Sequence, residues 1–72
     1  MNLNADECAI LDALCQGLMK REIMSILRLT SSRLNHRLED ARTKSDSDTT
    51  YELVSKYTAW KLEAAFREQG RG

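Results

Sequence analysis

Turn-forming residues are scarce in this sequence, which has no proline and only three glycines among 72 residues. Hairpins between strands need such residues, so their scarcity favours an all-α fold. The sequence also lacks any run near the roughly 20 apolar residues of a membrane-spanning helix. A basic and then apolar N-terminal signal pattern is missing too. We therefore expect a single small cytoplasmic domain over residues 1–72, with no membrane partner.

Net charge is also absent, because eleven basic residues balance eleven acidic ones. A strongly basic chain would by itself favour a nucleic-acid partner. In this chain, DNA binding requires instead that basic side chains gather on one face.

Chemically reactive side chains are few. Cys8 and Cys15 lie on one predicted helix, where a rise of about 1.5 Å per residue separates their Cα atoms by roughly 10 Å. A disulfide spans about 7 Å at most, so both thiols should stay reduced. His36 is the sole histidine, and no phosphate loop, catalytic carboxylate pair or metal-ligand cluster accompanies it. We expect no enzyme, no metal site and no cofactor.

Apolar residues recur at helical spacing in four segments. The first helix should begin at Ala5, with Asn4 as its N-cap, and end at Gly17, which adopts the left-handed conformation easily. A short helix is predicted over residues 20–27. A bend over residues 28–30 then leads into a longer helix.

The third predicted helix, residues 31–44, combines a narrow apolar stripe with a free polar face. Thr30 is its expected N-cap. The stripe consists of Leu34, Leu38 and Ala41. The opposite face carries side chains able to hydrogen-bond to bases or phosphates, namely Ser32, Asn35, His36, Glu39 and Thr43. A helix-turn-helix presents its second helix in this way.

The fourth predicted helix, residues 50–69, follows a polar loop and is capped by Thr49 or Thr50. Its expected inner stripe is Leu53, Tyr57, Trp60 and Ala64. Its outer side is apolar as well, at Tyr51, Ala59, Leu62 and Phe66. Such a patch on a helix already buried on its other side indicates a partner, most simply a second copy of the chain. Residues 70–72 are expected to form a tail.

One set of positions fits a known pattern without a gap: Leu3, Glu7, Ile10, Leu11, Gly17, Leu18, Lys20, Arg21, Glu22, Ile23, Leu27, Leu29, Thr30, Leu34, Leu38, Lys44, Glu52, Leu53 and Val54. In these positions the chain resembles the LuxR/GerE-type DNA-binding domain of bacterial transcription regulators. The resemblance implies a small four-helix helix-turn-helix domain with residues 31–44 in the major groove of double-stranded DNA. It also implies a homodimer formed through the fourth helix. No receiver or ligand-binding domain accompanies the module, so we expect a stand-alone member.

The resemblance further implies which residues contact DNA. The family's base-reading positions fall on Asn35, His36 and Glu39, of which Glu39 can accept a hydrogen bond from a cytosine amino group. Arg33 and Arg37 stand where the family usually has Thr and His. The predicted DNA-binding residues are Lys20, Arg21, Thr30, Ser31, Ser32, Arg33, Asn35, His36, Arg37 and Glu39. A basic rim able to grip phosphates is predicted from Lys20, Arg21, Arg28, Arg33, Arg37 and Arg42.

Other departures from the family pattern leave an alternative open. Met19 replaces the Ser that usually caps the second helix, and Met24 replaces a small Ala between the two helices. The module can therefore also be a degenerate one that has lost DNA binding and sequesters another regulator through its fourth helix. Its arginines would then form a solvated face, paired with Glu39 and Asp40.

Overall fold

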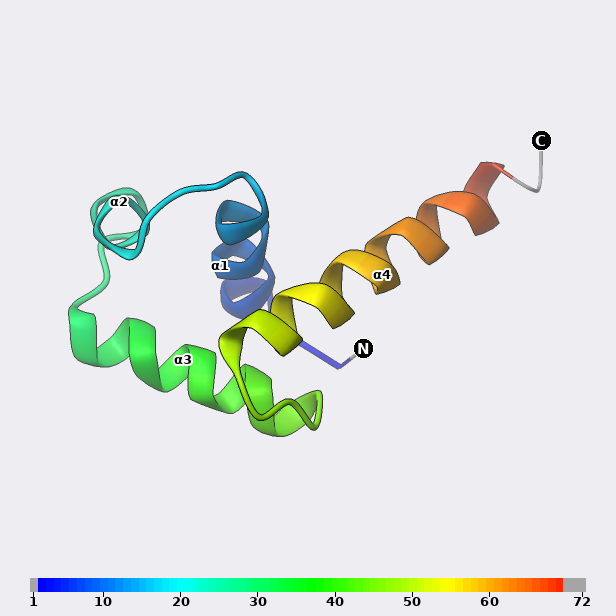
Figure 1. Cartoon of the computed structure of the whole chain (residues 1–72). Helices are drawn as coiled ribbons and strands as arrows, with labels where there is room; N and C mark the ends of the chain where they lie inside the picture. Colours follow the sequence, from blue (N-terminus) through cyan, green and yellow to red (C-terminus); the bar gives the residue numbers. More distant parts are fainter. Residues whose placement is uncertain (1, 70–72) are drawn as a thin grey trace.

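Four helices form the chain in the computed structural model, which describes residues 2–69 (Figure 1). They are α1 (Ala5–Cys15), α2 (Lys20–Leu27), α3 (Ser31–Lys44) and α4 (Thr50–Gln69). No strand occurs among the described residues, and the predicted all-α fold is confirmed. The predicted tail, residues 70–72, lies outside the described residues.

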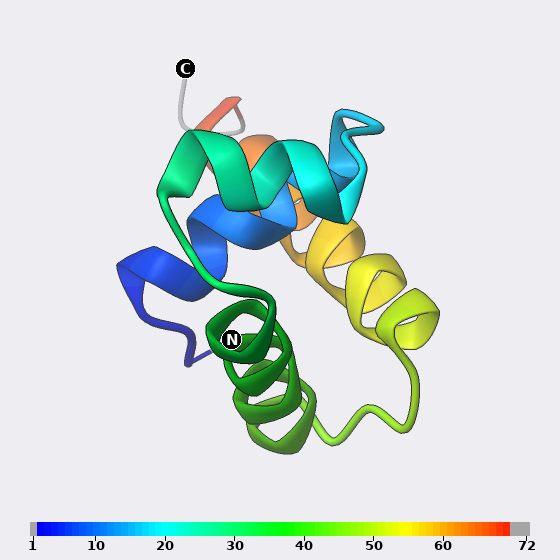
Figure 2. The ribbon, with the colours of Figure 1, turned by 90° about the vertical axis from the view of Figure 1, so that its left-hand side faces the viewer.

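The first and third helices are the centre of the arrangement, because α1 and α3 each contact the other three helices. Seen from the end of the molecule, α2 lies in front of α1, α3 lies below them, and α4 runs behind α1 (Figure 2). The second half of α4 extends beyond the other helices (Figure 1). The molecule therefore has a packed body and one projecting helix end.

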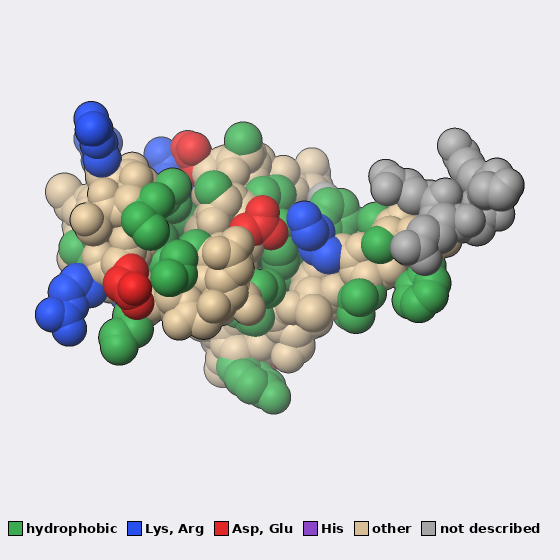
Figure 3. Space-filling model, turned by 90° about the horizontal axis from the view of Figure 1, so that it is seen from above, with side chains coloured by type: hydrophobic (Ala, Val, Ile, Leu, Met, Phe, Trp, Pro, Cys, Tyr) green, Lys and Arg blue, Asp and Glu red, His purple; other side chains and the backbone are tan. Residues whose placement is uncertain are grey.

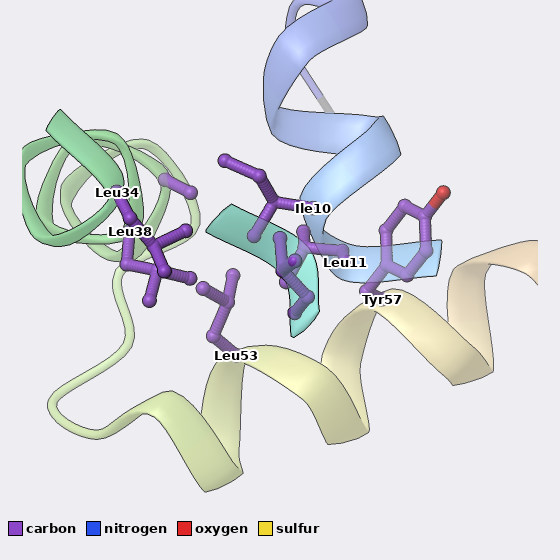
Figure 4. Close-up of a cluster of buried hydrophobic side chains, with 8 residues drawn as sticks. Ile10, Leu11, Leu34, Leu38, Leu53 and Tyr57 are labelled. Atoms are coloured by element: carbon purple, nitrogen blue, oxygen red, sulfur yellow. The ribbon is translucent and has the colours of Figure 1, made fainter. Parts of the chain in front are cut away.

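The core lies where the four helices meet, and each helix supplies part of it (Figure 4). Its buried side chains are Ile10, Leu11, Ile23, Leu34, Leu38, Ala41, Leu53 and Tyr57. The stripe predicted for residues 31–44 is thus fully buried. Burying one large apolar side chain stabilises a fold by about 1.5 to 3 kcal/mol, so this cluster is the main source of stability.

Local capping explains where the helices begin. Asn4 Oδ1 accepts a hydrogen bond from the Glu7 N–H (2.9 Å), and Glu7 Oε1 accepts one from the Asn4 N–H (2.9 Å). The N–H groups at a helix start lack partners within the helix, and this reciprocal pair satisfies two of them. Thr30 caps α3 through the Arg33 N–H (3.2 Å). Thr49, rather than Thr50, caps α4.

The second helix begins less firmly. Met19 occupies its N-cap position, and its side chain makes no capping hydrogen bond. Of the two hydrogen bonds in a reciprocal capping pair, only one is present here, in which the Met19 N–H donates to Glu22 Oε1 (2.9 Å). The expectation that Met19 removes a cap is confirmed.

The predicted inner stripe of α4 was wrong in its second half. Leu53 and Tyr57 are buried, but Trp60 is 36% exposed and Ala64 is exposed. The physical reason is the length of α1, whose last residue, Cys15, lies beside Thr58 with the Sγ and Oγ1 atoms 3.4 Å apart. Past Lys61, which lies 3.6 Å from Asp12 of α1, α4 makes no hydrogen bond or ion pair with another helix among the described residues.

The α1–α4 seam is also polar. The Tyr57 hydroxyl donates to Asp12 Oδ1 at 2.6 Å, and Lys61 lies 3.6 Å from the same carboxylate oxygen. Burial, and then the hydrogen bond to Asp12, raise the pKa of Tyr57.

Both cysteines are free, Cys8 half-buried and Cys15 exposed. No helix in the described part of the chain has the length and apolar character needed to cross a membrane.

Candidate nucleic-acid interface

The turn between α2 and α3 sets the direction of the candidate recognition helix. The chain leaves α2 at Arg28, whose backbone is left-handed (φ 55°), and the Leu29 N–H donates to the Met24 carbonyl (3.0 Å). Thr30 then starts α3 in an extended conformation. Because Ile23 and Leu34 are both buried in the core, the two helices are fixed to each other and the opposite side of α3 faces outward.

The predicted DNA-binding residues are nearly all accessible. Nine of the ten are exposed, and Arg37 is half-buried. On an α-helix with about 100° between successive residues, Asn35, His36 and Glu39 fall within an arc of about 100°. The predicted base-reading trio thus shares one face of α3, opposite its buried stripe.

A small open hollow lies on the flank of the same face. It is lined by Ser32, Arg33, His36 and Arg37, so it gathers two guanidinium groups and an imidazole on one side of α3. Asn35 lies on the other flank, about 160° around the helix from Arg37. Lys20 and Arg21 are exposed on the first turn of the neighbouring helix α2.

Ion pairs divide the predicted basic rim into two kinds of residue. Arg37 Nη2 lies 3.4 Å from Asp6 Oδ2 on α1, and its Nε is buried without a hydrogen-bond partner. His36 Nε2 lies 3.5 Å from Asp40 Oδ2 on the next turn. The remaining rim residues form no ion pair with any residue in the part of the chain that the structure describes: Lys20, Arg21, Arg28, Arg33 and Arg42.

This pairing differs from the one expected for a solvated face. The arginines of α3 make no ion pair with Glu39 or Asp40 among the described residues. Asp40 instead lies 3.5 Å from the His36 ring, and the partner of Arg37 comes from α1. Arg33 therefore keeps its charge available for an external anion, whereas Arg37 is partly neutralised.

The buried carboxylate that positions α3 was missed at the sequence level. Glu7 is 2% exposed, and its Oε1 accepts a hydrogen bond from Lys44 Nζ (2.8 Å) in addition to the Asn4 N–H. Burial raises the pKa of Glu7, but the hydrogen bonds from Lys44 and Asn4 outweigh it and hold the pKa below its ordinary value. Together with the Asp6–Arg37 pair, this contact fixes α3 to α1 at two points.

Seen from above, Lys and Arg side chains project at the end of the molecule that carries α2, and hydrophobic side chains follow α4 toward the other end (Figure 3). Charged hydrogen-bond donors at one end suit an anionic, hydrogen-bonding surface, whereas the apolar helix end suits a protein surface. Comparison of the chain with protein-family models, curated proteins and solved structures gives no match.

Proposed function

We propose that the chain is a bacterial transcription regulator of the cytoplasm that binds double-stranded DNA as a dimer, with α3 in the major groove. The observation that carries the proposal is the exposed face of α3, on which Asn35, His36 and Glu39 lie together. Arg33 lies beside them and forms no ion pair among the described residues. A helix of this kind fits the width of the major groove, and its side chains reach base edges.

The proposed contacts fall into two groups. Asn35, His36 and Glu39 read base edges, since amide, imidazole and carboxylate groups match their donors and acceptors. Lys20, Arg21 and Arg33 are exposed, form no ion pair in the described part of the chain and contact phosphates. The Ser31 and Ser32 hydroxyls and the first turn of α3 lie where a phosphate can approach.

Dimerisation is proposed through the outer face of α4. Tyr51 is 83% exposed, Leu62 57% and Phe66 71%, and Ala59 lies exposed between them. Large apolar side chains left in water favour association. A dimer also doubles the DNA contacts by reading two half-sites.

A second candidate function is a module that sequesters another regulator and does not bind DNA. Glu39 and Asp40 support it, because they place two carboxylates on the exposed face of α3, where phosphates would be repelled. The exposed apolar side of α4 would then receive the other regulator.

Titration of labelled genomic DNA fragments at about 50 and 200 mM salt tests the first function, with fluorescence anisotropy as the readout. The affinity should fall steeply with salt. Arg33→Ala should lower the log-log slope by about 1. Asn35→Ala should alter sequence preference at a cost of about 1 to 3 kcal/mol. Lys61→Ala, which removes a charge from α4, is the matched control and should leave the slope unchanged.

Glu39→Lys separates the two candidate functions. In a DNA-reading protein the change alters the preferred sequence. In a sequestering module it creates non-specific DNA affinity, because one repulsive carboxylate is removed and a phosphate ligand is added. A wild-type chain that binds no DNA even at low salt, beside a Glu39→Lys variant that does, would reject the first function and favour the second.

A further inference from the structure

One flank of α4 carries an ordered row of charges. Glu52, Lys56, Glu63 and Arg67 fall within about 60° of one another around the helix. All four reach solvent, and they form two ion pairs within the helix, Glu52–Lys56 and Glu63–Arg67, each with an N–O distance of 3.3 Å. The row adjoins the outer apolar face, so it would border any helix packed there.

The signs along this row are self-complementary when the helix is reversed. They run negative, positive, negative, positive from Glu52 to Arg67. Turning a second α4 by 180° about a point between residues 59 and 60 places Arg67 of that copy opposite Glu52, and Glu63 of that copy opposite Lys56. Four attractive pairs then border the contact. In a parallel pair related by a two-fold axis along the helices, the two rows would instead lie on opposite sides of the contact, so these attractive pairs would not form.

The same centre accommodates the exposed apolar side chains. After this rotation, Phe66 of one helix lies at a height along the helix axis between Tyr51 and Ser55 of the other helix. Leu62 of the first helix lies at a height between Ser55 and Ala59 of the second. Residues four apart on one helix form the space that receives a side chain from a neighbouring helix, and the small Ser55 and Ala59 leave room for it. The charges thus select one register, and the shape of the outer face is compatible with it.

The fold leaves room for this arrangement. The outer face of α4 is exposed at Tyr51 and Ser55 in the first half and at Leu62 and Phe66 in the second. The second half projects past the body (Figure 1). In an antiparallel pair, the projecting half of one copy covers the free outer face of the other copy's first half.

We propose that a second copy of this chain packs antiparallel on the outer face of α4, with the two-fold axis passing between the levels of Ala59 and Trp60. The inference rests on the proposed function in one respect, since it specifies the geometry of the dimer. It is independent of DNA binding.

Charge reversal within the row tests the register. Glu63→Arg combined with Arg67→Glu keeps the net charge and an ion pair within the helix, but it turns all four contacts between copies repulsive. The dimer dissociation constant should rise by about tenfold to a hundredfold at low salt, and by less at high salt. An unchanged dissociation constant in analytical ultracentrifugation would overturn the register.

A complementary variant supplies the rescue. Glu52→Lys combined with Lys56→Glu should also weaken self-association, whereas a mixture of the two double variants should form a heterodimer, because every facing pair is attractive again. Lys56 also donates to the carbonyls of Ser45 (3.0 Å) and Asp46 (2.7 Å), so circular dichroism must first show that this variant is folded. A folded variant that gives no heterodimer overturns the proposal.

Cysteine cross-linking decides the orientation without charge changes. In a background with Cys8→Ala and Cys15→Ser, Ala59→Cys should form a disulfide-linked dimer. Ser55→Cys should not, because a rise of about 1.5 Å per residue places its two copies roughly 13 Å apart along the antiparallel helices. Efficient cross-linking at position 55 would indicate a parallel pair and overturn the proposal. A monomeric wild-type chain would overturn the proposal and the dimer together, while the DNA titration stands as a separate result.

Discussion

At the scale of single residues, the buried Glu7 carboxylate makes the free energy of unfolding depend on pH in the acid range. Because the folded chain holds the pKa of Glu7 below its ordinary 4.5, this stabilisation is complete above about pH 4.5 and is lost as the pH falls through the folded pKa. Urea unfolding between pH 7 and pH 3 should therefore show a falling free energy of unfolding. Glu7→Gln should cost about 1 to 3 kcal/mol at pH 7 and flatten the acid profile.

The control for this prediction is Glu52, a second described carboxylate with a lowered pKa. The backbone hydrogen bond from Asp48 is the first cause of that shift, and Lys56 adds to it. Glu52→Gln should change the acid profile less than Glu7→Gln, because Glu52 is solvated and Glu7 is buried. Equal profiles for wild type and Glu7→Gln would contradict the assignment.

Single residues also show which contacts can be predicted from the sequence and which cannot. The spacing of Asn4 and Glu7 is that of a capping box and is local, so it was available from the sequence. The Lys44–Glu7 ion pair joins residues 37 apart in the chain. No local pattern specifies such a pair, because it depends on how α3 packs on α1. Whether the ten predicted DNA-binding residues touch DNA stays a prediction.

At the scale of helices, α4 should respond unequally to loss of its aromatic residues. Tyr57 is buried and Trp60 is partly exposed, with ring centroids 5.8 Å apart. Tyr57→Ala should lower the free energy of unfolding by about 3 to 5 kcal/mol, and Trp60→Ala by about 1 kcal/mol or less. Thermal unfolding followed by circular dichroism measures both values.

Tyr57→Phe is the matched control, because it removes only the hydroxyl that donates to Asp12 and should cost about 0.5 to 1.5 kcal/mol. A larger loss for Trp60→Ala than for Tyr57→Ala would contradict the observed end of the core.

The sequence predicted the boundaries of α2 and α3 because caps and breaks are local. It did not predict where the buried stripe of α4 stops, since that depends on the length of α1.

At the scale of the whole molecule, self-association should be separable from folding. Leu62→Glu combined with Phe66→Glu should convert the proposed dimer to a monomer in analytical ultracentrifugation while helical circular dichroism persists, because neither side chain belongs to the core. Ile26→Glu, which changes an exposed apolar residue of α2, is the matched control and should leave association unchanged. A double variant that still dimerises would place the interface elsewhere.

The contacts of α1 also have a consequence for synthesis. This helix is made before the other three, yet Lys44 and Tyr57, which bond to Glu7 and Asp12, follow those residues by 37 and 45 positions. The core cannot close until α4 has emerged. At about 5 to 20 residues per second, the nascent chain spends several seconds with the apolar side of α1 uncovered. Slow codons between the α1 and α4 segments would prolong that interval, whereas slow codons ahead of α1 would not.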